Sequence, residues 1–106
     1  MIDRKGYKKL KVWEKAHKFA IEIYRLSNKF PKEELYGLTS QIRRSAFSTP
    51  LNIVEGHASF SKKEFLSFLN IANRSLVETE YQRLEKMRTE IGIMLNAFTK
   101  SIRASK

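Results

Sequence analysis

Apolar residues recur at helical spacing along residues 9–29, and this is the clearest pattern in the chain. They return alternately every four and every three positions, as in the seam of a coiled coil. The members of this apolar stripe are Val12, Ala16, Phe19, Ile23, Leu26 and Phe30. Trp13, Ala20 and Tyr24 extend the apolar surface on one flank. The pattern predicts an amphipathic helix with more apolar surface than one neighbouring helix covers.

A second stripe runs one position ahead of the apolar one and is basic at six of its seven positions. Its members, called here the basic stripe, are Lys8, Lys11, Lys15, Lys18, Glu22, Arg25 and Lys29. Side chains about 5 Å apart along a helix can meet successive backbone phosphates, which predicts contacts with nucleic acid. The alternative is an ordinary solvated helix face, although such faces usually mix charges of both signs.

After a turn, "FPKEELYG", a second helix is expected. Pro31 favours the start of a short helical piece, and Gly37 permits a tight corner. The apolar spacing then predicts a helix that begins near Leu38 or Thr39 and ends within residues 56–58.

Pro50 falls inside this second helix. Its missing amide leaves the Ala46 carbonyl without a partner, so we expect a kink at residues 46–50. Asn52 and Glu55 are expected to satisfy freed polar groups, and Gly56 to allow close approach of a neighbouring backbone. The stretch therefore indicates packing geometry and not a catalytic site.

Arg43 and Arg44 are adjacent and point to different sides of the predicted helix. One of them is expected to reach phosphate, while the other pairs with Glu33, Glu34 or Glu55. The alternative is that both form ion pairs within or between subunits.

Ser61 and Glu64 form a capping box that predicts the start of a third helix. No proline follows within residues 61–105, but the phase of the apolar residues slips inside "VETEYQR". This segment is therefore either one long helix or a pair of helices broken near residues 77–82 or 88–92. A long helix would overhang its own bundle, so its distal half would pack on another chain.

Composition and charge limit the kinds of partner and of chemical site that the chain can have. The 106 residues include 21 Lys and Arg against 11 Asp and Glu, a net charge of +10 that favours polyanionic partners. Without cysteine there is no disulfide, thiol nucleophile or thiolate metal site. No apolar run is long enough to span a membrane, and the first residues lack the apolar core of a signal peptide, so a cytoplasmic protein without membrane partners is expected.

Enzyme chemistry finds little support. A di-iron bundle needs two Glu-x-x-His pairs, and only Glu14 with His17 provides one, since His57 has Val54 three positions before it. Neither histidine has an evident Ser and Asp constellation, and no phosphate-binding glycine loop is present. We expect no catalytic residue, no metal and no cofactor.

Three stretches carry a resemblance to a known family: "LKVWEKAHKFAIEIYRLSNKFPKEELYGLTSQIRRSAFSTPLNIVEG", "SKKEFLSFLNIANRSLVETE" and "IGIMLNAFTKSI". They resemble the four-helix-bundle proteins encoded by intervening sequences in bacterial 23S ribosomal RNA genes. The most specific element is "YGL..QIRRSA.S.P.NI.EG", which begins at Tyr36, with Trp13 and "FP" upstream. The resemblance implies one all-α, antiparallel up-and-down bundle domain over residues 1–106, a cytosolic homopentamer, no established enzymatic activity and an association with ribosomal RNA.

The sequence departs from that family after "VETE", where the turn between the third and fourth helices is absent. The number of helices within the chain therefore stays open. A related protein, the accessory variability determinant of diversity-generating retroelements, is similar in fold and binds nucleic acid and a reverse transcriptase. It suggests an alternative function as a protein-interaction scaffold or an accessory subunit of a nucleic-acid enzyme.

Overall fold

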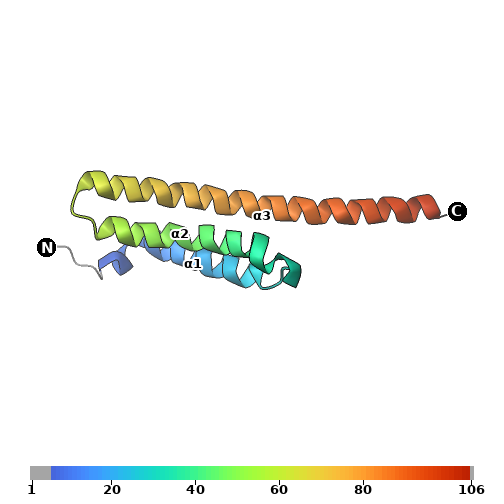
Figure 1. Ribbon diagram of the computed structural model, residues 1–106, viewed down its shortest axis with the longest axis horizontal. Helices are drawn as coiled ribbons and strands as arrows, with labels where there is room; N and C mark the ends of the chain where they lie inside the picture. Colours follow the sequence, from blue (N-terminus) through green and yellow to red (C-terminus); the bar gives the residue numbers. More distant parts are fainter. Residues whose placement is uncertain (1–5, 106) are drawn as a thin grey trace.

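The computed structural model describes residues 6–105, and within this range every regular element is a helix. Three α-helices follow one another: α1 (Lys11–Ser27), α2 (Ser40–His57) and α3 (Lys62–Ala104). α2 lies between α1 and α3, and α3 extends far beyond both of them (Figure 1). The molecule is accordingly elongated, with extents of 75 × 24 × 22 Å. The all-α class is confirmed.

The first helix is shorter at its start than predicted. Residues Gly6–Lys9 form a separate 3-10 turn, η1, and Leu10 has an extended backbone before α1 begins. Lys8 therefore lies on η1 and not on α1, so the periodicity of α1 does not fix its direction. This corrects its assignment to the helical stripe.

The connection between α1 and α2 follows the prediction closely. Pro31 precedes a 3-10 turn, η2 (Lys32–Glu34), and a wide π-helical turn, η3 (Leu35–Thr39), leads into α2. The backbone is non-helical at Gly37, with φ −114° and ψ −106°, and the chain changes direction there. α2 itself begins at Ser40, one or two residues later than expected, and ends at His57 as expected.

Pro50 does not interrupt α2, which is helical from residue 40 to residue 57. The Asn52 side-chain amide donates to the Ser48 carbonyl at 2.8 Å and lies 3.0 Å from the Ser48 hydroxyl. It therefore supports the turn beside Pro50 and does not replace the bond that the Ala46 carbonyl lacks. Glu55 is exposed and makes no side-chain hydrogen bond within residues 6–105, so its expected role as a polar partner is not seen.

The contact between α2 and α3 is close because small residues line it. A Cβ atom at Gly56 would lie 2.9 Å from Phe65 Cδ1 and 3.0 Å from Phe68 Cβ, so only glycine fits without displacement. Further along, the hydroxyls of Thr79 and Ser45 hydrogen-bond at 2.8 Å across the same interface. The predicted close approach at Gly56 is confirmed, and the buried hydroxyls satisfy one another.

Two small apolar clusters form the core. One joins α1 to α2 and consists of Ala20, Ile23, Ile42 and Ala46, with Phe19, Phe30 and Phe47 packed around it. In the other, Ala16, Ile53 and Ala72 meet, one from each α-helix. The three helices thus form a single packed unit up to about the middle of α3.

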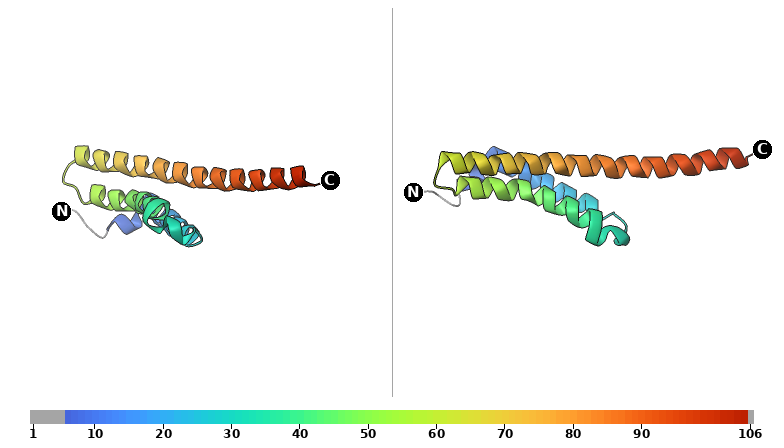
Figure 2. Two further views of the ribbon diagram at one scale, coloured as in Figure 1. Left: turned by 45° about the vertical axis from the view of Figure 1, so that its right-hand side comes forward. Right: turned by 45° about the horizontal axis from the view of Figure 1, so that its top comes forward.

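α3 is one uninterrupted helix of 43 residues. The Ser61 hydroxyl accepts a hydrogen bond from the Glu64 amide at 3.1 Å, which confirms the predicted cap. No break occurs near residues 77–82 or 88–92, so the long-helix alternative is the one observed (Figure 2). The described residues hold three α-helices, and a four-helix arrangement within the chain stays a prediction.

Candidate nucleic-acid interface

The basic stripe lies on the solvent side of α1. The residues of α1 that are buried are Ala16, Ala20, Ile23 and Ser27. The basic members of the stripe are all exposed: Lys8, Lys11, Lys15, Lys18, Arg25 and Lys29. Over the 17 residues of α1 the stripe is about 26 Å long. The exposure of these cations fits both the nucleic-acid interpretation and the solvated-face alternative, and contact with nucleic acid stays a prediction.

Most of this positive charge is not neutralised by neighbours. Lys18 Nζ lies 3.1 Å from Glu14 Oε1, one turn earlier, and both side chains are more than half exposed. Such an exposed pair contributes little and is readily exchanged for another anion. Within residues 6–105, no carboxylate lies within salt-bridge distance of the other five cations of the stripe.

Arg43 has a structural role, because its guanidinium binds residues at the end of α1. Its Nε donates to Ser27 Oγ and its Nη2 to Asn28 Oδ1, both at 2.7 Å, and its guanidinium lies 4.1 Å from the Tyr24 ring centroid. These partners lie at the C-terminal end of α1, where the helix dipole favours a cation. The prediction of an acidic partner is wrong for Arg43, because its partners are neutral groups of α1 and its C-cap.

Arg44 is the more available of the two arginines. Its side chain is exposed, and its Nη2 lies 3.4 Å from Ser40 Oγ, a weak contact. It borders a shallow surface pocket that Ser48, Ser75 and Glu78 also line. Of the two, Arg44 is therefore the one whose guanidinium is free to meet a phosphate, but it lies beside α3 and is not brought together with the basic stripe of α1.

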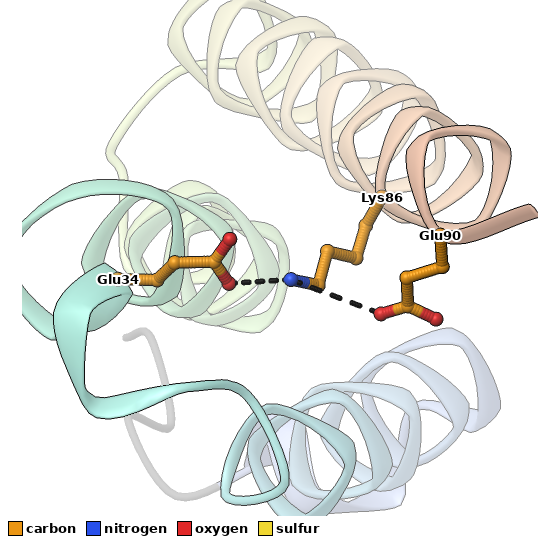
Figure 3. Close-up of polar contacts among 3 residues, drawn as sticks. All are labelled: Glu34, Lys86 and Glu90. Atoms are coloured by element: carbon orange, nitrogen blue, oxygen red, sulfur yellow. Dashed lines mark hydrogen bonds and ion pairs between the residues drawn. The ribbon is translucent and has the colours of Figure 1, made fainter. Parts of the chain in front are cut away.

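Of the carboxylates expected to pair with an arginine, Glu34 is used elsewhere. Its carboxylate contacts the ammonium group of Lys86 on α3, and Glu90 lies 3.7 Å from the same ammonium (Figure 3). Lys86 was not singled out from the sequence, because its partner Glu34 is 52 residues away and no local pattern connects them. Arg88, one turn from Glu85, donates to it, and this hydrogen bond raises the pKa of the Arg88 guanidinium.

The aromatic residues of α1 serve packing. The Trp13 ring stacks on His17 at 4.9 Å between ring centroids and meets the edge of Tyr7 at 5.0 Å. Tyr24 lies under Arg43 and edge-on to Phe47. His17 covers one face of the Trp13 ring and Arg43 one face of the Tyr24 ring, so packing contacts already use part of the surface that base stacking would need.

Tyr36 behaves differently from the rest of its sequence motif. Its side chain is 94% exposed, so it has no packing role within the described residues. Gly37, Pro50 and Gly56, in contrast, shape the turn, α2 and the contact with α3. The motif is therefore largely a packing element, with one aromatic side chain left in solvent.

The described residues hold no group of three or more His, Cys, Asp and Glu side chains placed to bind a metal ion. None of the helices in residues 6–105 combines the length and apolarity that crossing a membrane requires. The absence of a metal or cofactor stays a prediction.

Comparison with known proteins gives one finding. A family model described as 23S rRNA-intervening sequence protein matches residues 8–97, which include α1, α2 and most of α3. No curated protein matches the chain significantly.

Proposed function

Because the chain belongs to the 23S rRNA-intervening sequence protein family, we propose that it is a non-enzymatic, homo-oligomeric cytoplasmic protein that binds structured RNA. Ribosomal RNA is the target that the family description favours. The phosphate contacts are the six cations of the basic stripe, with Arg44 assisting. Arg43 is left out, because its hydrogen bonds to Ser27 and Asn28 hold α1 against α2.

The observation that carries this proposal is the exposure of all six cations: Lys11, Lys15, Lys18 and Arg25 lie on the side of α1 opposite its buried residues, and Lys8 and Lys29 lie just before and just after that helix. A stripe of this kind releases counterions from a phosphate backbone, and the net charge of +10 adds long-range attraction. Because Trp13 and Tyr24 are occupied by packing, stacking on single-stranded bases has little support. Recognition of a helical RNA by its backbone and shape suits the stripe better.

A second candidate function is that of a scaffold or accessory subunit whose target is another protein, such as a reverse transcriptase. The observation that favours it is the exposed apolar surface of α3 beyond Lys86. In that case the basic stripe would serve solubility and steering, and RNA affinity would be low and indifferent to which cations are removed.

The proposal is tested by two triple variants of equal charge change. Lys11, Lys15 and Lys18 are replaced by Glu in the first; Lys62, Lys63 and Arg74, exposed residues of α3, are replaced by Glu in the matched control. Removal of three phosphate contacts should lower the slope of log K against log salt by about 2 to 3. The control should keep the wild-type slope. Equal losses in both variants would exclude the basic stripe as the binding surface.

A further inference from the structure

The part of α3 beyond Lys86, residues 87–104, carries an apolar stripe on which no other described residue packs. Six large side chains in this distal half are 47–70% exposed: Met87, Ile91, Met94, Leu95, Phe98 and Ile102. They recur at helical spacing and so lie along one side of the helix. A continuous apolar stripe of this length indicates a partner surface.

A matching surface exists on the packed half of the molecule. α1 and α3 each pack on α2 but scarcely on each other, so the apolar side chains that α1 and α3 turn toward each other lack a covering helix; this uncovered face is called the furrow here. Val12 and Leu26 of α1 are 58% and 39% exposed, and Phe19 lies between them on the same stripe. Leu69 and Leu76 of α3 lie at about the levels of Val12 and Phe19, because Ala72 of α3 meets Ala16 of α1. A fourth helix placed on this face, between α1 and α3, would complete a four-helix bundle, and no described residue of the chain occupies that place.

The apolar residues of α1, read from N- to C-terminus, and those of α3, read from C- to N-terminus, have the same spacing. Along α1 the apolar positions 12, 16, 19, 23 and 26 are separated by four, three, four and three residues. Along α3, read from its C-terminal end toward its middle, positions 98, 94, 91, 87 and 84 are separated in the same order. An antiparallel helix would therefore place Phe98 beside Val12 and Ile91 beside Phe19. The distal half is about 27 Å long, close to the length of α1.

The distal half cannot reach the furrow of its own chain. α3 is an uninterrupted helix and carries residues 87–104 away from α1 (Figure 2). We propose that two copies of the chain exchange these segments, so that the distal half of each α3 fills the furrow between α1 and α3 of its partner. Each α3 then acts as the third helix of its own bundle and as the fourth helix of the partner's bundle.

The geometry of straight helices makes this exchange reciprocal. Consider the α3 helices of two copies lying antiparallel and side by side over their full length. The distal half of each α3 then lies along the first half of the other α3. The contact is isologous, with the two-fold axis near Arg83 at the middle of α3, and it closes at two chains.

The area is sufficient for a stable dimer. Six exposed apolar side chains in each copy, at on the order of 100 Å² apiece, together exceed the roughly 1,200 Å² of a specific interface once the furrow walls are added.

The basic stripe faces away from α2 and runs along the outer side of α1, so the dimer would present two such stripes to RNA.

The exchange specifies the self-association that is part of the proposed function. The experiments below contain no RNA, so a negative result would overturn the exchange without bearing on RNA binding. The family resemblance implies a pentamer and, within each chain, a turn between the third and fourth helices. α3 contains no such turn in the described residues. The subunit number five stays a prediction that the same measurement tests.

Light scattering after size exclusion gives the first test. The mass should be about twice the 12.4 kDa of the chain. Replacement of Ile91 by Asp should raise the dimer dissociation constant at least about 100-fold, because the carboxylate would be buried in two symmetric contacts. The control Asn96→Asp, on the exposed polar side of the distal half, should leave the mass unchanged. A wild-type mass of one chain or of five chains would overturn the exchange.

Disulfide formation gives the second test and depends on the chain having no native cysteine. The double variant Val12→Cys with Phe98→Cys should form a covalent dimer on mild oxidation. The control Glu14→Cys with Asn96→Cys occupies the same levels of the two helices but faces away from the furrow, and should stay uncross-linked. A disulfide that leaves the 12/98 variant a monomer would show that α3 folds back within its own chain, and equal cross-linking of both variants would show non-specific contact; either result overturns the exchange.

Discussion

The ammonium group of Lys86 lies 2.5 Å from the carboxylate of Glu34, so a residue in the middle of α3 is tied to the short η2 turn between α1 and α2 (Figure 3). The Lys86 side chain is only 10% exposed, and its ammonium lies 4.8 Å from the centroid of the Phe30 ring. This contact closes the end of the packed unit. Beyond it, α3 has no neighbour within the described residues.

Replacing Glu34 by Gln should destabilise the packed unit. Lys86 would remain largely buried and would keep only Glu90, at 3.7 Å, as a charged partner. We expect a loss of about 1–3 kcal/mol in the free energy of unfolding, below the value for a fully buried pair because the Glu34 side chain is about a third exposed. Urea denaturation at one fixed protein concentration measures it, since self-association also changes apparent stability.

The matched control is Glu14→Gln in the exposed pair with Lys18. Its effect should stay within about 0.5 kcal/mol, as for most exposed pairs. Equal effects of the two substitutions would contradict a special role for the Lys86 contact.

Gly56→Ala should destabilise the contact between α2 and α3. The new methyl group would lie within 3.0 Å of Phe65 and Phe68 atoms, so the helices must separate or the rings must move. The expected loss is about 1–3 kcal/mol, the range for overpacking in a close-packed interior. Thermal or chemical unfolding followed by circular dichroism measures it.

Gly92→Ala provides the opposite case. It lies inside α3, and no atom comes within 4 Å of the added methyl group. Alanine should therefore stabilise the helix by about 0.5–1 kcal/mol. If both glycine substitutions were stabilising, the close approach at Gly56 would be wrong.

Arg43 and Arg44 should separate stability from binding. Arg43→Ala removes two hydrogen bonds to Ser27 and Asn28, and the unfolding free energy should fall by about 1–3 kcal/mol. Arg44→Ala should change stability by no more than about 0.5 kcal/mol, because its side chain is exposed. In an RNA-binding assay the order should reverse, with Arg44→Ala weakening binding and Arg43→Ala leaving it near the wild-type value in folded protein. A larger loss of RNA affinity for Arg43→Ala would contradict these assignments.

Local pattern predicted much of the fold. The spacing of apolar residues located α1 and α2 to within a few residues, and the Ser61–Glu64 cap located the start of α3. These features depend on side chains within one or two turns of each other. The role of Gly56 was also accessible, because a glycine inside a helical pattern can mark a close contact with a neighbouring element, although Gly92 in α3 makes no such contact.

Contacts between residues far apart in the sequence could not be predicted from the sequence pattern. Nothing near Arg43 in the sequence points to Ser27 and Asn28, and nothing near Lys86 points to Glu34. The choice between a long α3 and a broken pair was left open, because helical periodicity continues on both sides of the phase slip and no proline forces a turn. The exposure of the basic stripe followed from its place beside the apolar stripe, whereas the separate position of Lys8 on η1 did not.

Fluorescence anisotropy of the purified protein decides whether the basic stripe binds structured RNA. A ribosomal RNA stem-loop, a DNA duplex of matched length and heparin are each titrated at several salt concentrations. The protein should bind the RNA more tightly than DNA or heparin, with a steep salt dependence that reflects several phosphate contacts. Weak binding to RNA, or equal binding to all three polyanions, would contradict this prediction.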